Sequence, residues 1–224
     1  MARRRTSDFI GQAFRERMRQ LNARHPWSHN DHFHSWILAN LPEPCRSVLD
    51  VGCGRGELLT ALAPHVDHVV GADIDEEMRD VAARHCERLT NVSVTDRVWN
   101  EVEGSFDAVT MIAVLHHLPV EEALRDVRRL LAPGGLLVVG LAVPVTLADH
   151  AWDMASMVTN PLIGMVKHPW PSRVMEPPAP FPVKDPSLSL AELRDLVQKV
   201  MPGAVLRRHL GFRHTILWTK PHRG

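Results

Sequence analysis

The sequence predicts an α/β fold in which helices cover both faces of a doubly wound sheet of seven strands. Short apolar runs typical of buried strands begin at residues 47, 68, 92, 106 and 136, and segments with helical patterns separate them. A glycine-rich turn follows the first run, at a place where open α/β sheets bind ligands. Two further runs, 204–209 and 215–218, are expected to complete the sheet as a hairpin.

Length and composition fit one domain with additions. The chain has 224 residues, 45% of them hydrophobic, which is enough for a core. Its formal net charge of zero gives no overall attraction to nucleic acid or acidic membranes. Three cysteines without a C-x-x-C pair favour a reducing compartment and argue against zinc. With no apolar run of about 20 residues and no secretory signal, we expect a cytoplasmic protein.

The glycine spacing in the turn at 52–56 distinguishes between two kinds of cofactor. Gly52, Gly54 and Gly56 let a ligand approach the backbone, but the third glycine comes one residue too early for the G-x-G-x-x-G pattern of dinucleotide sites. Asp50 precedes the turn, where it would repel a pyrophosphate and attract an ammonium group. The segment resembles the D-x-G-x-G-x-G signature of class I S-adenosylmethionine-dependent methyltransferases of the bacterial small-molecule type. This resemblance implies a Rossmann-like fold and makes Cys53, with Asp50 and the glycines, part of the cofactor site.

The second strand ends in another acid, Asp73, about 20 residues after the glycines. An acid at this position typically holds the hydroxyls of a ribose, and the resemblance assigns Asp73 that role, with Ile74 packing on the adenine. A helix cap is the alternative for Asp73, although Asp75 is better placed to cap the helix expected at 76–85.

The third and fourth strands supply further candidates. Asp96 follows the strand expected at 92–95, where relatives bind the adenine amino group; a simple turn residue is the alternative. The strand expected at 106–112 runs into Ala113 and a segment that resembles the family's "LHHL", including His116 and His117. The L-x-P-G-G motif ending at Gly135 resembles the family's turn into strand five.

The N-terminal residues 1–40 are expected to form a helical cover on a methyltransferase domain at 41–224. A helical pattern at 9–21 follows a basic arm. The segment around Trp27, His29 and Asn30 resembles W-x-H-N-x-x-(F/Y)-H, which implies contacts with the cofactor's methionine end. Nearby histidines could bind a metal, but no acid or cysteine cluster accompanies them, so no metal is expected.

A proline-rich insertion at 143–186 follows strand five. Its prolines exclude regular structure, while its tryptophans and methionines are too apolar for a linker, so we expect a packed lid over the acceptor site. Trp152, Met154 and Met157 are the predicted substrate contacts. These side chains could instead cover the sheet edge or bury a dimer contact. After the insertion, Ser189 and Glu192 form a capping-box pattern that predicts a helix to about Val200.

The sequence does not identify the methyl acceptor. His117, or less favourably His116, is the candidate general base, with pocket lining as the alternative. The motifs of adenine N6 and cytosine C5 enzymes are absent after strand four, which favours a small, rather apolar metabolite. The alternatives are an RNA or protein methyltransferase and a catalytically silent protein that binds S-adenosylmethionine. We expect S-adenosylhomocysteine as product, no membrane partner, and a monomer or homodimer.

Overall fold

The computed structural model describes residues 29–142, 188–208 and 213–222. In chain order, the longer elements are α2 (His29–Leu38), β1 (Ser47–Val51), α3 (Glu57–Leu62), β2 (His68–Ala72), α4 (Glu76–His85), β3 (Val92–Thr95), β4 (Phe106–Ile112), α5 (Val120–Leu130), β5 (Leu131–Ala142), α7 (Leu190–Val200), β6 (Val205–Arg208) and β7 (Arg213–Thr219). Short 3₁₀ helices lie at Ala63–His65, Trp99–Glu101 and Leu115–His117.

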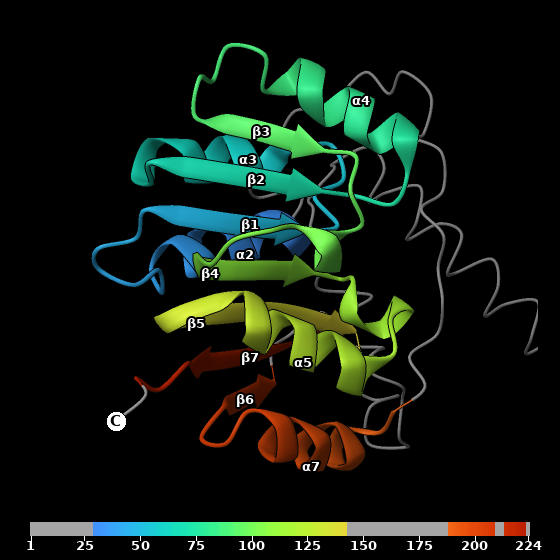
Figure 1. Cartoon of the computed structure of the whole chain (residues 1–224). Helices are drawn as coiled ribbons and strands as arrows, with labels where there is room; N and C mark the ends of the chain where they lie inside the picture. The colour runs from blue at the N-terminus through green and yellow to red at the C-terminus, as the bar shows by residue number, and fades with distance from the viewer. Residues whose placement is uncertain (1–28, 143–187, 209–212, 223–224) are drawn as a thin grey trace, which may run out of the picture. The chain divides into compact units, whose positions relative to one another are not determined.

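The strands form one seven-stranded sheet in the order β3-β2-β1-β4-β5-β7-β6 (Figure 1). The first five strands are parallel, while β7 pairs antiparallel with β5 and with β6. Strand order reverses at β1, so that β1 and β4 lie side by side at the switch point where open α/β sheets bind ligands.

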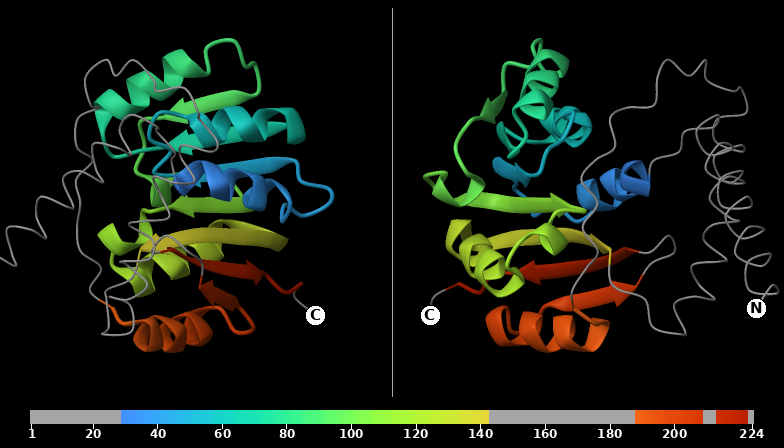
Figure 2. Two further views of the ribbon diagram at one scale, coloured as in Figure 1. Left: turned by 180° about the vertical axis from the view of Figure 1, so that it is seen from behind. Right: turned by 90° about the vertical axis from the view of Figure 1, so that its right-hand side faces the viewer.

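Helices cover both faces of the sheet, as the sequence predicts (Figure 2). Alternate residues of β1 face opposite sides: Leu49 packs with α5 and α7, and Val48 packs with α2, α3 and α4. Phe33 and Ile37 of α2 are 3% and 1% exposed, so α2 belongs to the helical layer on the sheet. The predicted N-terminal cover at 1–40 therefore stays a prediction for residues 1–28, which lie outside the described residues.

Two predicted helix starts are confirmed in atomic detail. Asp75 caps α4, accepting hydrogen bonds from the backbone amides of Glu77 and Met78 at 2.9 and 3.2 Å. Ser189 and Glu192 form the reciprocal capping box of α7. Both caps satisfy amides that the first helical turn would otherwise leave without partners.

Strand five begins earlier than the sequence predicts. Leu131 already pairs with Phe106, but the register then shifts, and Leu136 pairs with Ala108. The glycine turn of the L-x-P-G-G motif lies in this irregularity, with Gly134 at φ 81°. Backbone bonds to Lys220 hold it: the Gly134 amide donates to the Lys220 carbonyl, and the Lys220 amide donates to the Gly135 carbonyl. These partners are far apart in sequence, which is why local patterns missed the early start.

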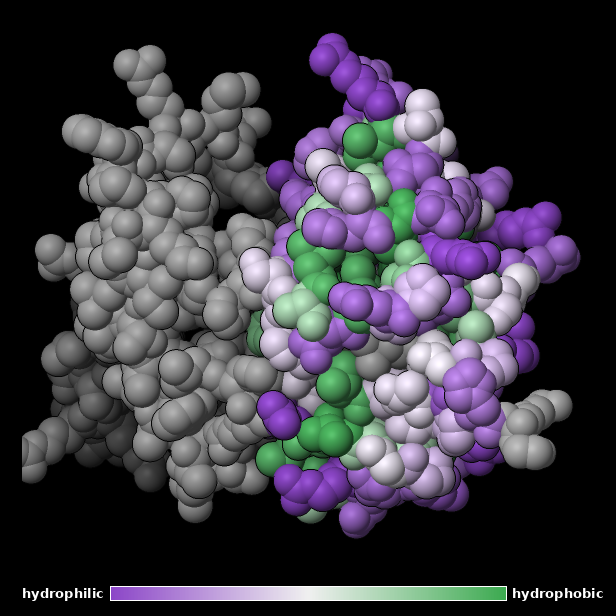
Figure 3. Space-filling model, turned by 90° about the vertical axis from the view of Figure 1, so that its left-hand side faces the viewer, coloured by the Kyte–Doolittle hydropathy of each residue, from purple (hydrophilic) through white to green (hydrophobic). Residues whose placement is uncertain are grey.

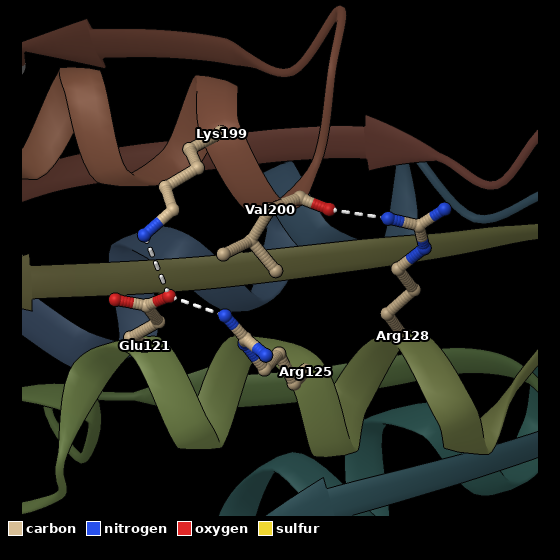
Figure 4. A network of polar contacts seen from close by, with 5 residues as sticks. All are labelled: Glu121, Arg125, Arg128, Lys199 and Val200. Atoms are coloured by element: carbon tan, nitrogen blue, oxygen red, sulfur yellow. Dashed lines mark hydrogen bonds and ion pairs between the residues drawn. The ribbon is translucent and has the colours of Figure 1, made fainter.

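Helices α5 and α7 are joined by polar contacts (Figure 4). Glu121 accepts hydrogen bonds from Lys199 at 2.9 Å and from Arg125 at 2.5 Å, which lower its pKa. Arg128 donates to the Val200 carbonyl at 2.8 Å and lies over the Trp218 ring. The α5–α7 layer is thereby fixed to the antiparallel end of the sheet.

The view onto the amino ends of the parallel strands shows two areas of apolar side chains among polar ones (Figure 3). Asp107 lies at this edge and accepts from the amides of Arg46 and Ser47 at 2.8 and 3.0 Å. These bonds join the start of β4 to the start of β1. None of the helices in the described residues has the length and apolar content needed to span a bilayer.

Candidate functional site

The carboxyl edge of the parallel strands brings together the candidates from four separate segments. Each segment directly follows a strand, and parallel strands end at one edge of a sheet (Figure 1). The segments are the glycine turn 52–56 after β1, residues 73–74 after β2, Asp96 after β3, and residues 113–117 after β4.

The glycine turn has the backbone conformation that its sequence demands. Gly52, Gly54 and Gly56 have φ values of 72°, 53° and 83°, in the region that favours glycine. The amide of Gly52 donates to the Ala72 carbonyl at 2.7 Å, which holds the turn against the end of β2. Val114, from the segment after β4, packs so closely that a Cβ on Gly52 would lie 2.1 Å from its Cγ2. The turn is thus clamped between the segments that follow β2 and β4.

This clamp predicts different results for alanine at two glycines of the turn. Gly52→Ala adds a clash with Val114 to the backbone strain, whereas a Cβ on Gly54 meets nothing within 4 Å. We expect Gly54→Ala to cost ~1 kcal/mol of stability from strain alone, and Gly52→Ala to cost roughly 1–3 kcal/mol more from overpacking. Thermal unfolding of both variants measures the difference. Val114→Ala should partly rescue Gly52→Ala; equal stabilities of the two glycine variants would contradict the clamp.

Asp73 is held in place by backbone groups on both carboxylate oxygens. Oδ2 accepts from the Gly54 amide at 2.8 Å, and Oδ1 accepts from the Asp75 amide at 3.0 Å. Arg79 donates to the carbonyls of Asp73 and Ile74 at 2.9 and 3.1 Å, which fixes the turn after β2. Each carboxylate oxygen can accept more than one bond, so the group keeps capacity for ligand hydroxyls.

Two exposed apolar side chains follow the ends of the neighbouring strands β2 and β3. Ile74 is 98% exposed and Val98 is 56% exposed, an unusual exposure for large aliphatic groups in the described residues. The paired strands β2 and β3 place both residues at the carboxyl edge. Arg97 forms a surface ion pair with Glu103, and Asp96 is exposed. An aromatic ring could pack on these aliphatic groups with a polar edge toward Asp96.

Asp50 is buried near the carboxyl end of β1. Its side chain is 3% exposed, and Oδ1 accepts a hydrogen bond from the Thr110 hydroxyl at 2.6 Å. Burial is the largest cause of a raised pKa for Asp50, and the charges of Asp73 and Glu57 add to it; against the lowering effect of the Thr110 hydrogen bond, the pKa of Asp50 is about 7. The neighbouring charges that act on Asp50 are therefore negative, and a ligand cation would compensate them.

Cys53 takes part in the turn through its backbone and packs its side chain inward. Its amide donates to the Ala72 carbonyl at 3.1 Å, and its carbonyl accepts from the Gly56 amide at 2.9 Å. The thiol is buried near Gly71, and burial raises its pKa far above the ordinary range. Because thiolate is the reactive form, the raised pKa disfavours reactivity of the Cys53 thiol, and a contact of Cys53 with the cofactor stays a prediction.

The segment after β4 carries a strained residue and the two histidines. Ala113 has φ 58°, and it is the one non-glycine residue with a left-handed conformation among those described. A 3₁₀ helix, Leu115–His117, follows it and places the rings of His116 and His117 with centroids 4.0 Å apart. Strain of this kind occurs preferentially at functional sites. Both histidines are half-buried at the carboxyl end of β4.

Several predicted contacts cannot be placed. Trp27, Trp152, Met154 and Met157 lie outside the described residues, as does the whole insertion at 143–186. His29 and Asn30 lie in the first turn of α2, but their side chains are not described. No group of three potential metal ligands occurs within the described ranges.

Three residues that shape the site were not predicted. Thr110 binds Asp50, Val114 fills the space over Gly52, and Arg79 holds the Asp73–Ile74 turn. A polar residue in the middle of the apolar fourth strand was a signal for Thr110. Val114 and Arg79 gave no comparable signal, because their roles depend on contacts between segments.

The resemblance to known proteins includes the glycine turn and extends over most of the chain. The Methyltransferase domain family matches residues 48–135. An uncharacterized methyltransferase of Mycobacterium tuberculosis is 34% identical over 202 residues, covering 88% of this chain and 98% of the relative. A ubiquinone biosynthesis O-methyltransferase of Coxiella burnetii is 36% identical over 97 residues, 41% of this chain and 42% of the relative.

Solved structures show the same fold. An N-methyltransferase of Bradyrhizobium japonicum matches with a TM-score of 0.56 at 16% identity, over 86% of this chain and 97% of that structure. The magnesium protoporphyrin IX methyltransferase of Synechocystis with bound S-adenosylhomocysteine has a TM-score of 0.55 at 22% identity, over 85% of this chain and 80% of that structure. With the near full-length mycobacterial relative, these likenesses place the chain in the class I S-adenosylmethionine-dependent methyltransferases, with S-adenosylmethionine as its cofactor.

Proposed function

We propose that the chain transfers a methyl group from S-adenosylmethionine to a small, rather apolar metabolite. The observation that carries this proposal is the convergence of the clamped glycine turn, the backbone-held Asp73 and the exposed Ile74 at the carboxyl edge. In this proposal Asp73 binds the ribose hydroxyls, Ile74 and Val98 flank the adenine, and Asp96 accepts from its amino group. The glycine turn and Ala113 lie along the methionine part.

Methyl transfer requires little chemistry from the protein, because the sulfonium already activates the methyl group. The protein positions a nucleophile in line with the methyl group and removes a proton where necessary. The only described pair of adjacent imidazoles at this edge follows β4, which supports a role for His117 in proton removal from a hydroxyl or amine. An alternative role for His117 is lining of the cofactor pocket.

The segment after β4 supports a small acceptor. This chain has Ala113-Val114-Leu115-His116 where adenine N6 enzymes carry (N/D)-P-P-(Y/F). No Pro-Cys pair, the nucleophile motif of cytosine C5 enzymes, follows β4; the pair Pro44-Cys45 lies before β1. The partial likeness to the ubiquinone biosynthesis O-methyltransferase covers less than half of the chain and gives weaker support of the same kind.

The test is transfer of radiolabelled methyl groups to matched acceptor panels, with His117→Ala as the informative variant. We expect label in small phenols, hydroxy acids or amines, and none in transfer RNA, DNA or denatured protein. If His117 is the base, kcat should fall ~10²-fold or more while cofactor affinity holds. Weaker cofactor binding with kcat retained assigns His117 to pocket lining, and label confined to a macromolecule would contradict the small acceptor.

A further inference from the structure

Charge is unevenly distributed along a chain whose formal net charge is zero. No aspartate or glutamate follows Asp195 in the sequence. Residues 205–224 contain five basic residues: Arg207, Arg208, Arg213, Lys220 and Arg223. Three of them cluster around the β6–β7 hairpin, so the local field there is positive.

Strand direction places this basic cluster at the same edge as the cofactor site. Because β7 runs antiparallel to β5, its first residue, Arg213, pairs with Ala142, the last residue of β5 (Figure 1). Arg208, the last residue of β6, pairs with His214, and Arg207 pairs with Thr215. All three arginines therefore occupy the carboxyl edge of the parallel strands. We name Arg207, Arg208 and Arg213 the basic edge.

The opposite half of this edge is acidic. Burial, and to a smaller extent the charges of Asp73 and Glu57, raise the pKa of Asp50, and Asp75 and Asp96 are exposed beyond β2 and β3. An acidic environment suits the ammonium and sulfonium groups of the cofactor. It gives no reason for positive charge at the other end, where β6 and β7 lie. Strands β4 and β5, with the histidine pair, separate the two halves.

Arg207 of the basic edge has no acidic partner within the described part of the chain. It is exposed and forms no ion pair with another described residue, whereas Arg97, Arg125, Arg129 and Lys199 each pair with an acid. Strands in a sheet lie about 4.8 Å apart, so β7, two strands from β4, is roughly 10 Å from the end of β4. That span fits one small molecule with a reacting atom over β4 and a charged group over β7.

We propose that the methyl acceptor carries an anionic group, a carboxylate or a phosphate, which the basic edge binds. This inference rests on the proposed function, since it states which group of the same methyl acceptor the protein recognises. Guanidinium groups bind both anions with paired hydrogen bonds, so the two are distinguished by experiment. The rather apolar body of the acceptor then lies between the anion and the methyl group.

The test uses the full chain saturated with S-adenosylhomocysteine and three probes of similar shape: benzoate, phenyl phosphate and neutral benzamide. Ligand-observed NMR titration gives their affinities. We expect at least one anion to bind about tenfold more tightly than benzamide, with a preference that weakens as salt shortens the Debye length. The double variant Arg207→Gln/Arg213→Gln should lose most of this preference. Arg46→Gln removes a positive charge at the opposite edge and should keep it.

Calorimetry of S-adenosylhomocysteine on the same samples separates this inference from the proposed function. If cofactor binding is intact but the chain shows no preference for anions, or a preference that is unchanged in the double variant, the proposal that the basic edge binds an anion is wrong. The proposed methyltransferase function is not affected by that result. Salt-sensitive RNA binding that is lost in the double variant, without preference for small anions, also overturns it. If the double variant does not fold, the unmodified chain decides whether the proposal holds, through the salt dependence of its affinity for benzoate compared with its affinity for benzamide.

Discussion

Asp50→Asn is expected to change the pH dependence of stability and to weaken cofactor binding in one substitution. The folded protein holds a proton on Asp50 up to about pH 7, whereas an ordinary aspartate releases it near 3.8. The native state therefore binds more protons between these values, so Asp50 lowers stability as pH rises through this window. Asparagine keeps the size and the acceptor for Thr110 but cannot ionise.

The expected result is a difference in stability that grows with pH. Between about pH 4.5 and pH 8, the unfolding free energy of Asp50→Asn should increase relative to that of the unmodified chain by up to ~4 kcal/mol. This upper bound is the free energy that corresponds to a shift of about three pKa units. Loss of the charge should also weaken S-adenosylmethionine binding above pH 7, where the Asp50 carboxyl is ionised, because a negative charge that attracts the ammonium group of the ligand is removed. Denaturant unfolding at several pH values and calorimetry measure the two effects.

Asp107→Asn is the matched control. Asp107 lies at the opposite edge of the sheet and accepts from the Arg46 and Ser47 amides, so its replacement should cost ~1–2 kcal/mol of stability. Cofactor affinity should not change. A pH-independent stability difference for Asp50→Asn would show that the Asp50 carboxyl titrates normally, and unchanged cofactor affinity would remove it from the site.

Asp73→Ala is expected to reduce cofactor affinity by ~1.5–3 kcal/mol, roughly 10- to 150-fold, because hydrogen bonds to charged groups are worth about that. The substitution also removes the carboxylate that accepts from the Gly54 amide, so the glycine turn loses a contact. A structural role alone could therefore mimic part of the effect, and a control with a similar structural cost is required.

Asp75→Ala supplies that control two residues away. It removes the two bonds that cap α4 and should cost ~1 kcal/mol of stability. Since Asp75 caps the helix and has no predicted cofactor contact, binding should stay within a few-fold. Equal losses of affinity in both variants would assign the effect at Asp73 to loosening of the turn, and Asp73 would no longer be a ribose ligand.

Local signals predicted most of the fold, and contacts between segments account for the differences. The starts of α4 and α7 follow from capping residues within three positions of the helix, and β3 and β4 follow from short apolar runs. The early start of β5 depends on pairing with Phe106, and the place of α2 depends on Phe33 and Ile37 packing under β1. Neither contact has a local signature.

In the candidate site, too, local signals predicted some residues, whereas contacts between segments determine the features that were not predicted. The glycines and Asp73 were predicted because their spacing reflects backbone conformations that few other residues permit. Asp50 was predicted from the same pattern as an acid that attracts an ammonium group, but its partner Thr110 was not predicted. Burial arises only when β1, β2 and β4 pair, so the raised pKa of Asp50 could not be read from the sequence.

Calorimetric titration of the unmodified chain with S-adenosylhomocysteine and, separately, with NAD tests the central claim most directly. The acidic half of the carboxyl edge and the early third glycine disfavour a pyrophosphate and suit an amino acid and a ribose. The account predicts saturable, one-to-one binding of S-adenosylhomocysteine and no heat of binding with NAD. Binding of NAD, or no saturable binding of S-adenosylhomocysteine, would contradict it.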